Sequence, residues 1–310
     1  MALKNKYLIG VIYGLMASII WAAFPVMTRF GVAKSNFDEW DMTFIRFFLS
    51  GLIAIPYLLF KFKSQNPVKV PLHSIIIMTI GLGAPYMYVI SSGLKLAPVE
   101  QFAVVTPSSM IAFSLLLSII FFKTKIHLNE YIGISIILFG VLLIGFISFG
   151  TSSLYSYLFF LLGGAMWAAY TVVSKHYCSS PLYATMIVSF YSLILYLPIY
   201  LYKKSFDIFF ISPDILIPQL IYQGIFVSII ALFFYSQSVL ILGATSGSVF
   251  AALVPALATI TSALTLNEFP EISSILGLFI ISIGMMITVI KFNGNLVFKK
   301  TNVKGRKEND

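Results

Sequence analysis

Runs of apolar residues, separated by short polar connections, account for almost the whole chain. Each run is close to the length of about 20 residues that a helix needs to cross the hydrocarbon layer of a membrane. Because the connections are short, the pattern predicts an all-α integral membrane protein with ten transmembrane helices and no inserted soluble domain. The ten expected helices lie near residues 7–30, 41–61, 72–93, 98–122, 128–149, 155–177, 182–202, 214–238, 243–266 and 271–292.

Composition supports a membrane protein and excludes several other classes. The 310 residues are 59% hydrophobic and 10% charged, with a mean hydropathy of +0.96, whereas soluble domains are roughly 45–50% apolar and about 25% charged. A soluble enzyme, a nucleic-acid-binding domain and a disulfide-linked secreted module are therefore excluded. Cys178 is the single cysteine, so neither an internal disulfide nor a cysteine metal cluster is expected. We expect no cofactor and no metal.

The distribution of positive charge predicts the orientation of the helices. With the N-terminus in the cytoplasm, 14 of the 20 Lys and Arg residues lie on the cytoplasmic side and five on the other. Cytoplasmic loops carry an excess of such residues, so we expect a multi-pass protein of the inner membrane with both termini in the cytoplasm. The basic tail at 293–310 is expected to be cytoplasmic and to fix this orientation. Contact with anionic lipid is an alternative role for the tail.

An internal repeat divides the chain into two halves. The segment WAAFPVMTRF at 21–30 matches WAAYTVVSKH at 167–176. Further pairs follow at similar offsets, Pro107 with Pro255 and Gly140 with Gly284 among them. The predicted units are residues 1–150 with five helices, 151–292 with five helices, and the tail. An odd number of helices in each unit places the second copy upside down, which is the inverted-topology repeat of many secondary transporters. A duplication without transport is the alternative.

The sequence resembles the EamA-type branch of the drug/metabolite transporter superfamily. The residues that carry the resemblance are WAAFPVMTRF, GLKLAPVEQFAVVTP at 93–107, and LGATSGSVFAALVPALATITSALTLNEFPEISSILGLFIISIGMMI at 242–287. The resemblance implies ten helices in two five-helix repeats and a central cavity bordered by helices 1, 3, 4, 6, 8 and 9. Trp21, Gln101, Trp167 and Tyr170 lie on these helices and are expected to bind substrate. The first repeat departs from the family in having Lys123 and Lys125 where an acidic residue is expected.

Arg46 is the one cation well inside a predicted helix. Thr43 and Ser50 at i−3 and i+4 continue a polar stripe on the same helix. One interpretation is that Arg46 extends to the nearby membrane surface or pairs with Asp41 or Glu39. The functional interpretation is a counter-charge for a substrate carboxylate near the outer gate.

Two further helices carry uncharged candidates for substrate binding. With a turn of 100° per residue, one face of helix 214–238 carries amide and aromatic side chains. Because an amide in hydrocarbon needs a hydrogen-bond partner, this face should point into the bundle. Helix 72–93 carries Gly and Pro residues that permit a bend, and broken helices often border transporter sites. Packing between helices is the alternative in both cases. The residues concerned are Gln219, Tyr222, Gln223, Phe226, Phe233 and Gln237 on the first helix, and Gly81, Pro85, Tyr86, Tyr88 and Ser92 on the second.

These features predict a secondary transporter or facilitator and not an enzyme. We expect it to export amino acids or related small metabolites by alternating access, with uptake of a nucleoside-like compound as the alternative. A membrane-embedded enzyme or lipid-handling protein would need a polar cluster in one leaflet, and none is visible. The expected partners are a small-molecule substrate and membrane lipid, without nucleic acid; a monomer is favoured over a dimer. No acidic residue lies deep in a helix, which favours a facilitator or exchanger over a proton antiporter, with Glu100 as the residue to watch.

Overall fold

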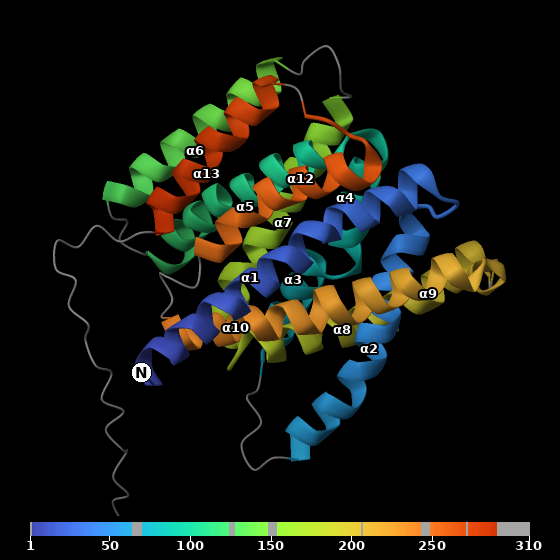
Figure 1. The fold of residues 1–310 in the computed structure, drawn as a ribbon. Coiled ribbons are helices and arrows are strands. Elements are labelled where there is room, and N and C mark those ends of the chain that lie inside the picture. The colour runs from blue at the N-terminus through green and yellow to red at the C-terminus, as the bar shows by residue number, and fades with distance from the viewer. Residues whose placement is uncertain are drawn as a thin grey trace, which may run out of the picture.

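Helices make up the structure, a computed structural model that describes residues 2–63, 70–123, 128–147, 154–205, 207–242, 249–270 and 272–289 (Figure 1). These ranges contain no strand. The α-helices are α1 (Ala2–Arg29), α2 (Glu39–Lys63), α3 (Leu72–Leu82), α4 (Ala84–Leu96), α5 (Val99–Phe122), α6 (Leu128–Ile147), α7 (Leu154–Tyr177), α8 (Pro181–Lys204), α9 (Pro213–Ile221), α10 (Ala231–Leu242), α12 (Val254–Leu266) and α13 (Ile272–Val289). Short π- or 3₁₀-helical segments are η1 (Phe30–Lys34), η2 (Asp207–Phe210), η3 (Tyr222–Ile230) and η4 (Val249–Leu253).

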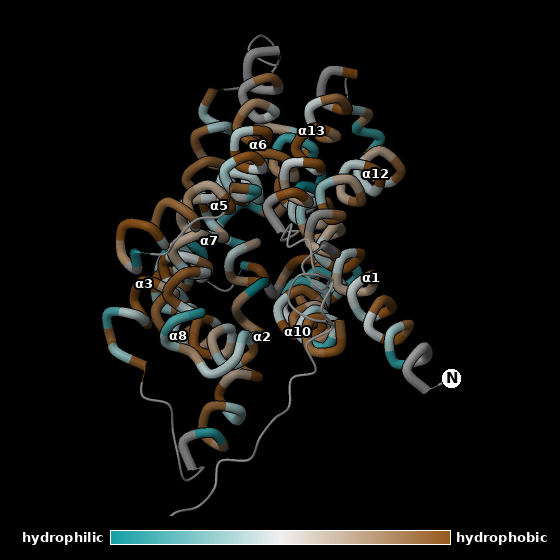
Figure 2. The backbone as a smooth tube through the Cα atoms, turned by 90° about the vertical axis from the view of Figure 1, so that its left-hand side faces the viewer, coloured by the Kyte–Doolittle hydropathy of each residue, from teal (hydrophilic) through white to brown (hydrophobic). Residues whose placement is uncertain are grey.

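The protein is a multi-pass membrane protein. Among the described residues, seven helical stretches are long and apolar enough to cross a membrane, and three shorter apolar helices lie at 131–140, 254–266 and 275–287. Each of the ten predicted runs therefore contains a helix among the described residues. Apolar residues, brown in Figure 2, recur along the helices, with paler and teal residues between them. The predicted tail at 293–310 and parts of the runs at 148–149, 243–248 and 290–292 lie outside the described residues.

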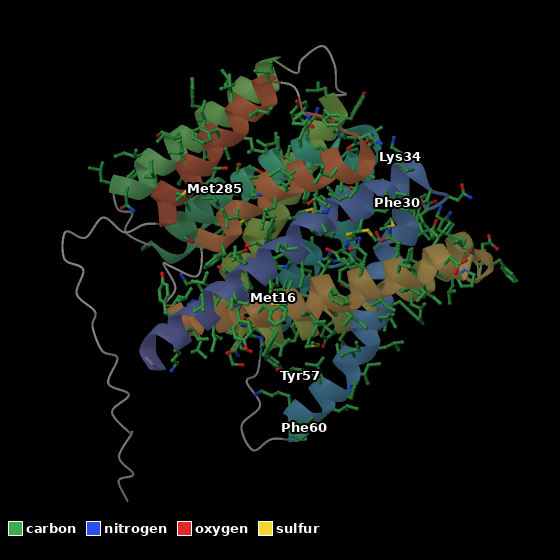
Figure 3. The ribbon with its side chains drawn as sticks, viewed as in Figure 1. Met16, Phe30, Lys34, Tyr57, Phe60 and Met285 are labelled. Carbon is green, nitrogen blue, oxygen red and sulfur yellow. The ribbon has the colours of Figure 1, made fainter. Side chains whose placement is uncertain are left out.

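Outward-facing side chains are apolar, as a lipid-facing surface requires. Figure 3 labels two of them, Met16 on α1 and Phe60 near the end of α2, which are 42% and 80% exposed. Met285, also labelled there, is buried where α13 packs against α6. This pair of helices forms its own small core with Val104 of α5, beside the main core of the bundle.

The fifth helix of each repeat packs against its counterpart, α6 against α13, in opposite directions. A Cβ on Gly140 would meet Ile281, and a Cβ on Gly284 would lie 2.9 Å from Ile137. The Asn129 amide at the start of α6 donates to the Ile287 carbonyl near the end of α13, at 3.4 Å. Residues that are equivalent in the two repeats thus make reciprocal contacts, which is the arrangement that an inverted repeat requires.

The second helix of each repeat also packs antiparallel against its counterpart. Near the start of α2, Asp41 accepts a hydrogen bond of 2.8 Å from the Tyr200 hydroxyl near the end of α8. Further along α2, a Cβ on Gly51 would lie 2.5 Å from the Leu193 Cβ, nearer the start of α8. The start of α2 thus contacts the end of α8, and a later part of α2 contacts an earlier part of α8. The antiparallel pair α2 and α8 therefore shows the same symmetry as the pair α6 and α13.

The third helix of each repeat is irregular near its middle. In the first repeat, Gly83 separates α3 from α4, and the Ala84 amide left free by this break donates to the Ser192 hydroxyl of α8 at 3.1 Å. In the second repeat, the π-helix η3 separates α9 from α10. Such interruptions are tolerated in a membrane where other groups satisfy the freed backbone, and π-helical segments are frequent at functional sites. The bend expected from Gly and Pro in helix 72–93 is therefore present.

Gly83 should not accept a side chain. A Cβ at this position would overlap the Thr79 carbonyl oxygen and the Ser192 hydroxyl that caps the break. We expect Gly83→Ala to lower the free energy of unfolding by about 3 kcal/mol, at the upper end of overpacking effects. Thermal unfolding of the detergent-solubilised protein measures this loss. A midpoint equal to that of the unchanged protein would show that the two helices separate easily here.

Pro25, Pro107 and Pro255 lie inside predicted helices, where the sequence predicts kinks or hinges, with tolerance by helix packing as the alternative. The structure places the three prolines differently from one another. Pro25 and Pro107 lie inside α1 and α5, as predicted. Pro255 does not interrupt a helix; it occupies the first turn of α12, after η4. The N–H groups of a first helical turn have no partner within the helix, so the missing N–H of Pro255 costs nothing there. Pro255 therefore starts a helix at a position where a kink was predicted.

Candidate functional site

The centre of the candidate site is Arg46, on the buried side of α2. Its guanidinium carbon lies 4.7 Å from the centre of the Phe24 ring and 6.0 Å from that of Phe47. Its Nε and Nη1 atoms are buried and have no hydrogen-bond partner among the described residues. A buried guanidinium stacked on an aromatic ring retains most of its capacity to bind an anion, because ring contacts leave its N–H donors free.

The predicted ion pair of Arg46 with Asp41 or Glu39 is absent from the structure. Glu39 lies 2.9 Å from the Lys95 ammonium, and Asp41 lies 3.4 Å from that of Lys204. Both carboxylates are thus engaged by cations on other helices, α4 and α8. The prediction failed because sequence spacing gives neighbours along one helix and not the cations brought in by other helices.

The other members of the predicted polar stripe, Thr43 and Ser50, do not hydrogen-bond the Arg46 guanidinium with their hydroxyl groups. The Thr43 hydroxyl donates to the Glu39 carbonyl at 2.7 Å, and the Ser50 hydroxyl donates to the Arg46 carbonyl at 2.8 Å. Both bonds lie within α2, where hydroxyl side chains commonly return to the preceding turn. The guanidinium is therefore the one member of this stripe with free donors.

Tyr86 of α4 lies near Arg46 and contacts Trp167 of α7. Tyr86 is buried, its ring centre lies 6.5 Å from that of Trp167 in an edge-to-face arrangement, and it is within electrostatic reach of Arg46. The break at Gly83 allows Tyr86 to turn inward while Pro85 stays exposed. Of the candidate residues on this helix, Tyr86 therefore faces the interior and Pro85 does not.

Two amides of the π-helical span face α1. Gln219 donates from Nε2 to the Met27 carbonyl at 2.9 Å, and Gln223 donates from Nε2 to the Thr28 hydroxyl at 3.1 Å. The Oε1 atoms of both amides are buried without a partner among the described residues. Each amide is thus anchored by its nitrogen and presents an unused acceptor. Tyr222, between them, donates to the Ile20 carbonyl at 2.6 Å.

The predicted polar face of this span is only partly correct. Gln219 and Gln223 are buried, but Phe226 and Phe233 are 40% and 47% exposed. A π-helix turns less per residue than an α-helix, so the 100° spacing used for the prediction no longer applies beyond Tyr222. No feature of the sequence pattern predicted the π-helix η3.

Four other predicted residues lie near the site without joining Arg46. Tyr88 packs on Trp40, with ring centres 4.8 Å apart. Trp21 packs on Tyr235 of α10 at 5.1 Å, which mirrors the contact of Trp167 with the third helix of the other repeat. The remaining two are Tyr170, which is buried and hydrogen-bonds Thr185 and Ser174, and Gln101, which is buried in the first turns of α5.

Arg29 and Glu268 form an ion pair that the sequence analysis missed. Arg29 Nε lies 2.9 Å from Glu268 Oε1, and both side chains are largely buried. Arg29 also donates to the Leu94 carbonyl at 2.7 Å, and Glu268 accepts from the Val99 amide at 3.3 Å and from the Ser262 hydroxyl at 3.1 Å. The pair joins α1, α4, α5 and the connection after α12. Its signal in the sequence was Glu268, the acidic residue of NEFP at 267–270, to which the sequence analysis assigned no partner.

The remaining ion pairs of the described residues lie at the same end of the bundle as Arg29 and Glu268. We term this end the ion-pair end. Lys204, in the last turn of α8, contacts Asp38 at 2.7 Å and Asp41 at 3.4 Å. Together with Glu39–Lys95, these contacts tie the segment between α1 and α2 to α4 and α8. Lys34 marks this end in Figure 3.

Asp38 gives the ion-pair end a defined pH dependence. Burial would raise the pKa of Asp38, but hydrogen bonds from Lys204 and Asp41 and the Lys204 charge outweigh burial, so this pKa is lowered below 3.8. A lowered pKa stabilises the folded state above the pKa of the unfolded chain and loses this effect as the pH falls through the folded value. We therefore expect the contribution of Asp38 to stay constant from about pH 5 to 8, to decrease as the pH falls below about 4, and to vanish only below the lowered pKa of the folded state. Thermal midpoints of the unchanged protein and Asp38→Asn across this range test this; a difference that changes between pH 5 and 8 would contradict it.

A separate groove with a volume of about 380 Å³ lies between α5, α6 and α7. Leu116, Tyr131 and Leu138 are among its mainly apolar lining residues, and none of the predicted site residues is. The hydroxyls of Ser108 and Ser109 at its edge bond their own helix. This groove is therefore distinct from the Arg46 site.

Comparison with known proteins agrees with the two-repeat fold. The sequence model of the EamA-like transporter family matches residues 8–146 and again residues 154–290. No curated protein matches the chain. Among 24 matching chains of solved structure, one crystal structure of a protein has a TM-score of 0.61 and 17% identity, covering 90% of this chain and 96% of its own. That likeness concerns the fold alone. The two family matches together cover most of the sequence, and the chain belongs to the EamA-like transporter family.

Proposed function

We propose that the protein is a secondary transporter that exports small organic metabolites, amino acids or related compounds, across the inner membrane by alternating access. The observation that carries this proposal is the unpaired, buried guanidinium of Arg46 between the two repeats. Arg46 belongs to the first repeat, and η3 of the second repeat packs beside it, with a Cβ on Gly224 only 3.6 Å from the Arg46 carbonyl. A polar site at the junction of two repeats is where secondary transporters bind their substrates.

We place the ion-pair end at the outer face and both termini in the cytoplasm, with ten spans in two inverted repeats. The excess of Lys and Arg on the opposite side supports this orientation. Figure 1 shows that α1 begins and α13 ends at the same end of the bundle, away from Arg29 and Glu268. In this arrangement the ion pairs form the closed outer gate, and their separation would open the site to the outside.

The described charges favour a facilitator or exchanger over an obligate proton antiporter. A proton relay in a membrane needs a titratable group at the site. Asp41 is held by Tyr200 and Lys204 at the ion-pair end and not at Arg46. Glu100, in the first turn of α5, is buried near the same end.

Reconstitution in liposomes tests the proposed function. Radiolabelled amino acids, nucleosides and organic cations would be offered with and without a pH gradient, beside protein-free liposomes as the control. We expect flux of at least one amino acid without the gradient. Absence of flux for every solute would overturn transport, and flux that requires the gradient would overturn uncoupled movement and direct attention to Glu100.

A further inference from the structure

Two helix faces border the groove between α5, α6 and α7. On each helix the lining residues recur at intervals of three or four, as on one face of a helix. α7 packs on α5 at Ser109, and α13 packs on α6 at Ile137 (Figure 1). The two faces therefore enclose a space of about 380 Å³ that no described helix fills. The residues concerned are Ala112, Leu116 and Ile119 on α5, and Tyr131, Ile134 and Leu138 on α6.

The groove is open toward the membrane and suits an apolar occupant. Its rim is exposed, with Leu116 at 49% and Leu138 at 47%, whereas Ile137 and Ser108 are buried in its floor. The hydroxyls of Ser108 and Ser109 already bond carbonyls of α5, so neither seeks a polar ligand. Side chains that border an unfilled space lose dispersion contacts. Within the hydrocarbon layer, a lipid chain is the material at hand to restore them.

The length of the groove matches one leaflet of the bilayer. Ser108 and Ile119, near its two ends, lie about 16 Å apart along α5 at 1.5 Å per residue. Half of the hydrocarbon layer is about 15 Å thick. α5 starts at the ion-pair end, where the Val99 amide donates to Glu268. The groove therefore extends from the middle of the membrane to the opposite face, and its inner end is closed where α7 packs on Ser109.

A positive charge stands at the open end of the groove. Lys123 follows α5 one turn beyond Ile119, and its backbone amide donates to the Ile119 carbonyl at 3.0 Å. Its side chain is exposed and forms no ion pair with the described residues. Tyr131, in the first turns of α6, is 56% exposed beside the same end, and tyrosine is typical of the membrane–water boundary. Basic residues at such a position between helices bind anionic headgroups.

We infer that the groove binds one acyl chain of an anionic phospholipid, whose headgroup lies at Lys123. In the orientation proposed above, this lipid belongs to the cytoplasmic leaflet. The groove does not fit a helix of a second copy of the chain. A helix that crosses the membrane would continue past the closed inner end, and about 16 Å of helix with a diameter of about 10 Å occupies about 1,300 Å³. An acyl chain is thinner and ends in the middle of the bilayer.

The test compares two lipids that differ only in headgroup charge. The full-length, delipidated protein in detergent would be titrated with phosphatidylglycerol or with phosphatidylcholine of the same acyl chains, and bound lipids would be counted by native mass spectrometry. We expect one molecule of phosphatidylglycerol to bind about fivefold more tightly than phosphatidylcholine, the contribution of one lysine near an anionic headgroup. Binding in detergent is independent of transport and of orientation in the membrane.

Two kinds of variant assign the chain and the headgroup. Ala112→Trp fills the groove and should abolish the tight site, whereas Leu195→Trp, at a 58% exposed position of α8 outside the groove, is its control. Lys123→Gln should bind both lipids equally. Lys175→Gln removes an exposed charge from the last turn of α7, outside the groove lining, and should keep the preference.

Thermal midpoints without lipid show whether each variant folds. If Ala112→Trp does not fold, Leu116→Trp takes its place, because it enlarges a half-exposed side chain at the rim.

Three results would overturn the lipid site. The first is equal affinity of the unchanged protein for the two lipids, and the second is an unchanged preference in Lys123→Gln. The third is a folded tryptophan variant that binds phosphatidylglycerol as the unchanged protein does. If that variant also converts a dimer into a monomer, the groove is an interface between two copies of the chain and not a lipid site.

Discussion

Gly164→Val is expected to prevent stable assembly of the bundle. A Cβ on Gly164 would overlap the Ser109 hydroxyl and lie 2.9 Å from the Thr106 carbonyl oxygen and 3.0 Å from the Met110 amide nitrogen. Two of these obstacles are backbone atoms of α5, which cannot rotate away. Relief requires α7 and α5 to separate along their whole contact, so we expect a loss of at least about 3 kcal/mol. Yield of monodisperse protein and its thermal midpoint in detergent measure the effect.

The neighbouring glycine supplies the control for this experiment. A Cβ on Gly163 would meet the end of the Ile90 side chain, which is flexible. We expect Gly163→Ala to cost about 1 kcal/mol and Gly164→Ala clearly more. Equal midpoints for the two alanine variants would show that the closest approach of α5 and α7 is looser than the structure indicates.

Glu268→Ala has the second largest expected effect, because it removes the partner of a largely buried cation. Arg29 would keep its bonds to the Leu94 and Lys95 carbonyls but would lose its counter-charge, and the Val99 amide would lose its acceptor. Breaking a buried pair by removing one member is strongly destabilising. Since both side chains retain some solvent contact, we expect a cost of about 3 kcal/mol. Thermal unfolding in detergent measures this cost.

Two further variants separate loss of charge from loss of packing. Lys95→Gln breaks an exposed pair with Glu39 and should cost less than about 1 kcal/mol. The double variant Arg29→Met with Glu268→Leu removes both charges and should recover most of the stability lost in Glu268→Ala. A double variant as unstable as the single one would show that the pair acts through its shape and not through its charges.

The general architecture could be predicted from the sequence because it depends on local patterns. Runs of apolar residues located the helices, and the match of WAAFPVMTRF with WAAYTVVSKH located the repeat. The structure extends this match to side-chain contacts, with Trp21 and Trp167 each packing against the third helix of the other repeat. Seven of the ten predicted runs contain described helical stretches that are long and apolar enough to cross a membrane.

The contacts of the site could not be predicted, because they join helices far apart in the chain. One interpretation of Arg46 was that it pairs with Asp41 or Glu39, but Asp41 contacts Lys204 of α8 and Glu39 contacts Lys95 of α4. The same limitation hid the pairing of Arg29 with Glu268, which are 239 residues apart. Periodicity also assumed a regular helix, so the π-helix η3 displaced Phe226 and Phe233 from the predicted face.

Substrate counterflow tests the central claim, that one site between the repeats opens to each side in turn. Liposomes containing the protein and unlabelled amino acid would be diluted into a trace of the labelled compound, with Arg46→Gln liposomes in parallel. A carrier with alternating access exchanges the two, so we predict transient accumulation of label above equilibrium for the unchanged protein and none for Arg46→Gln. Label that only rises to equilibrium in the unchanged protein, at any internal concentration, would indicate a channel and contradict the account.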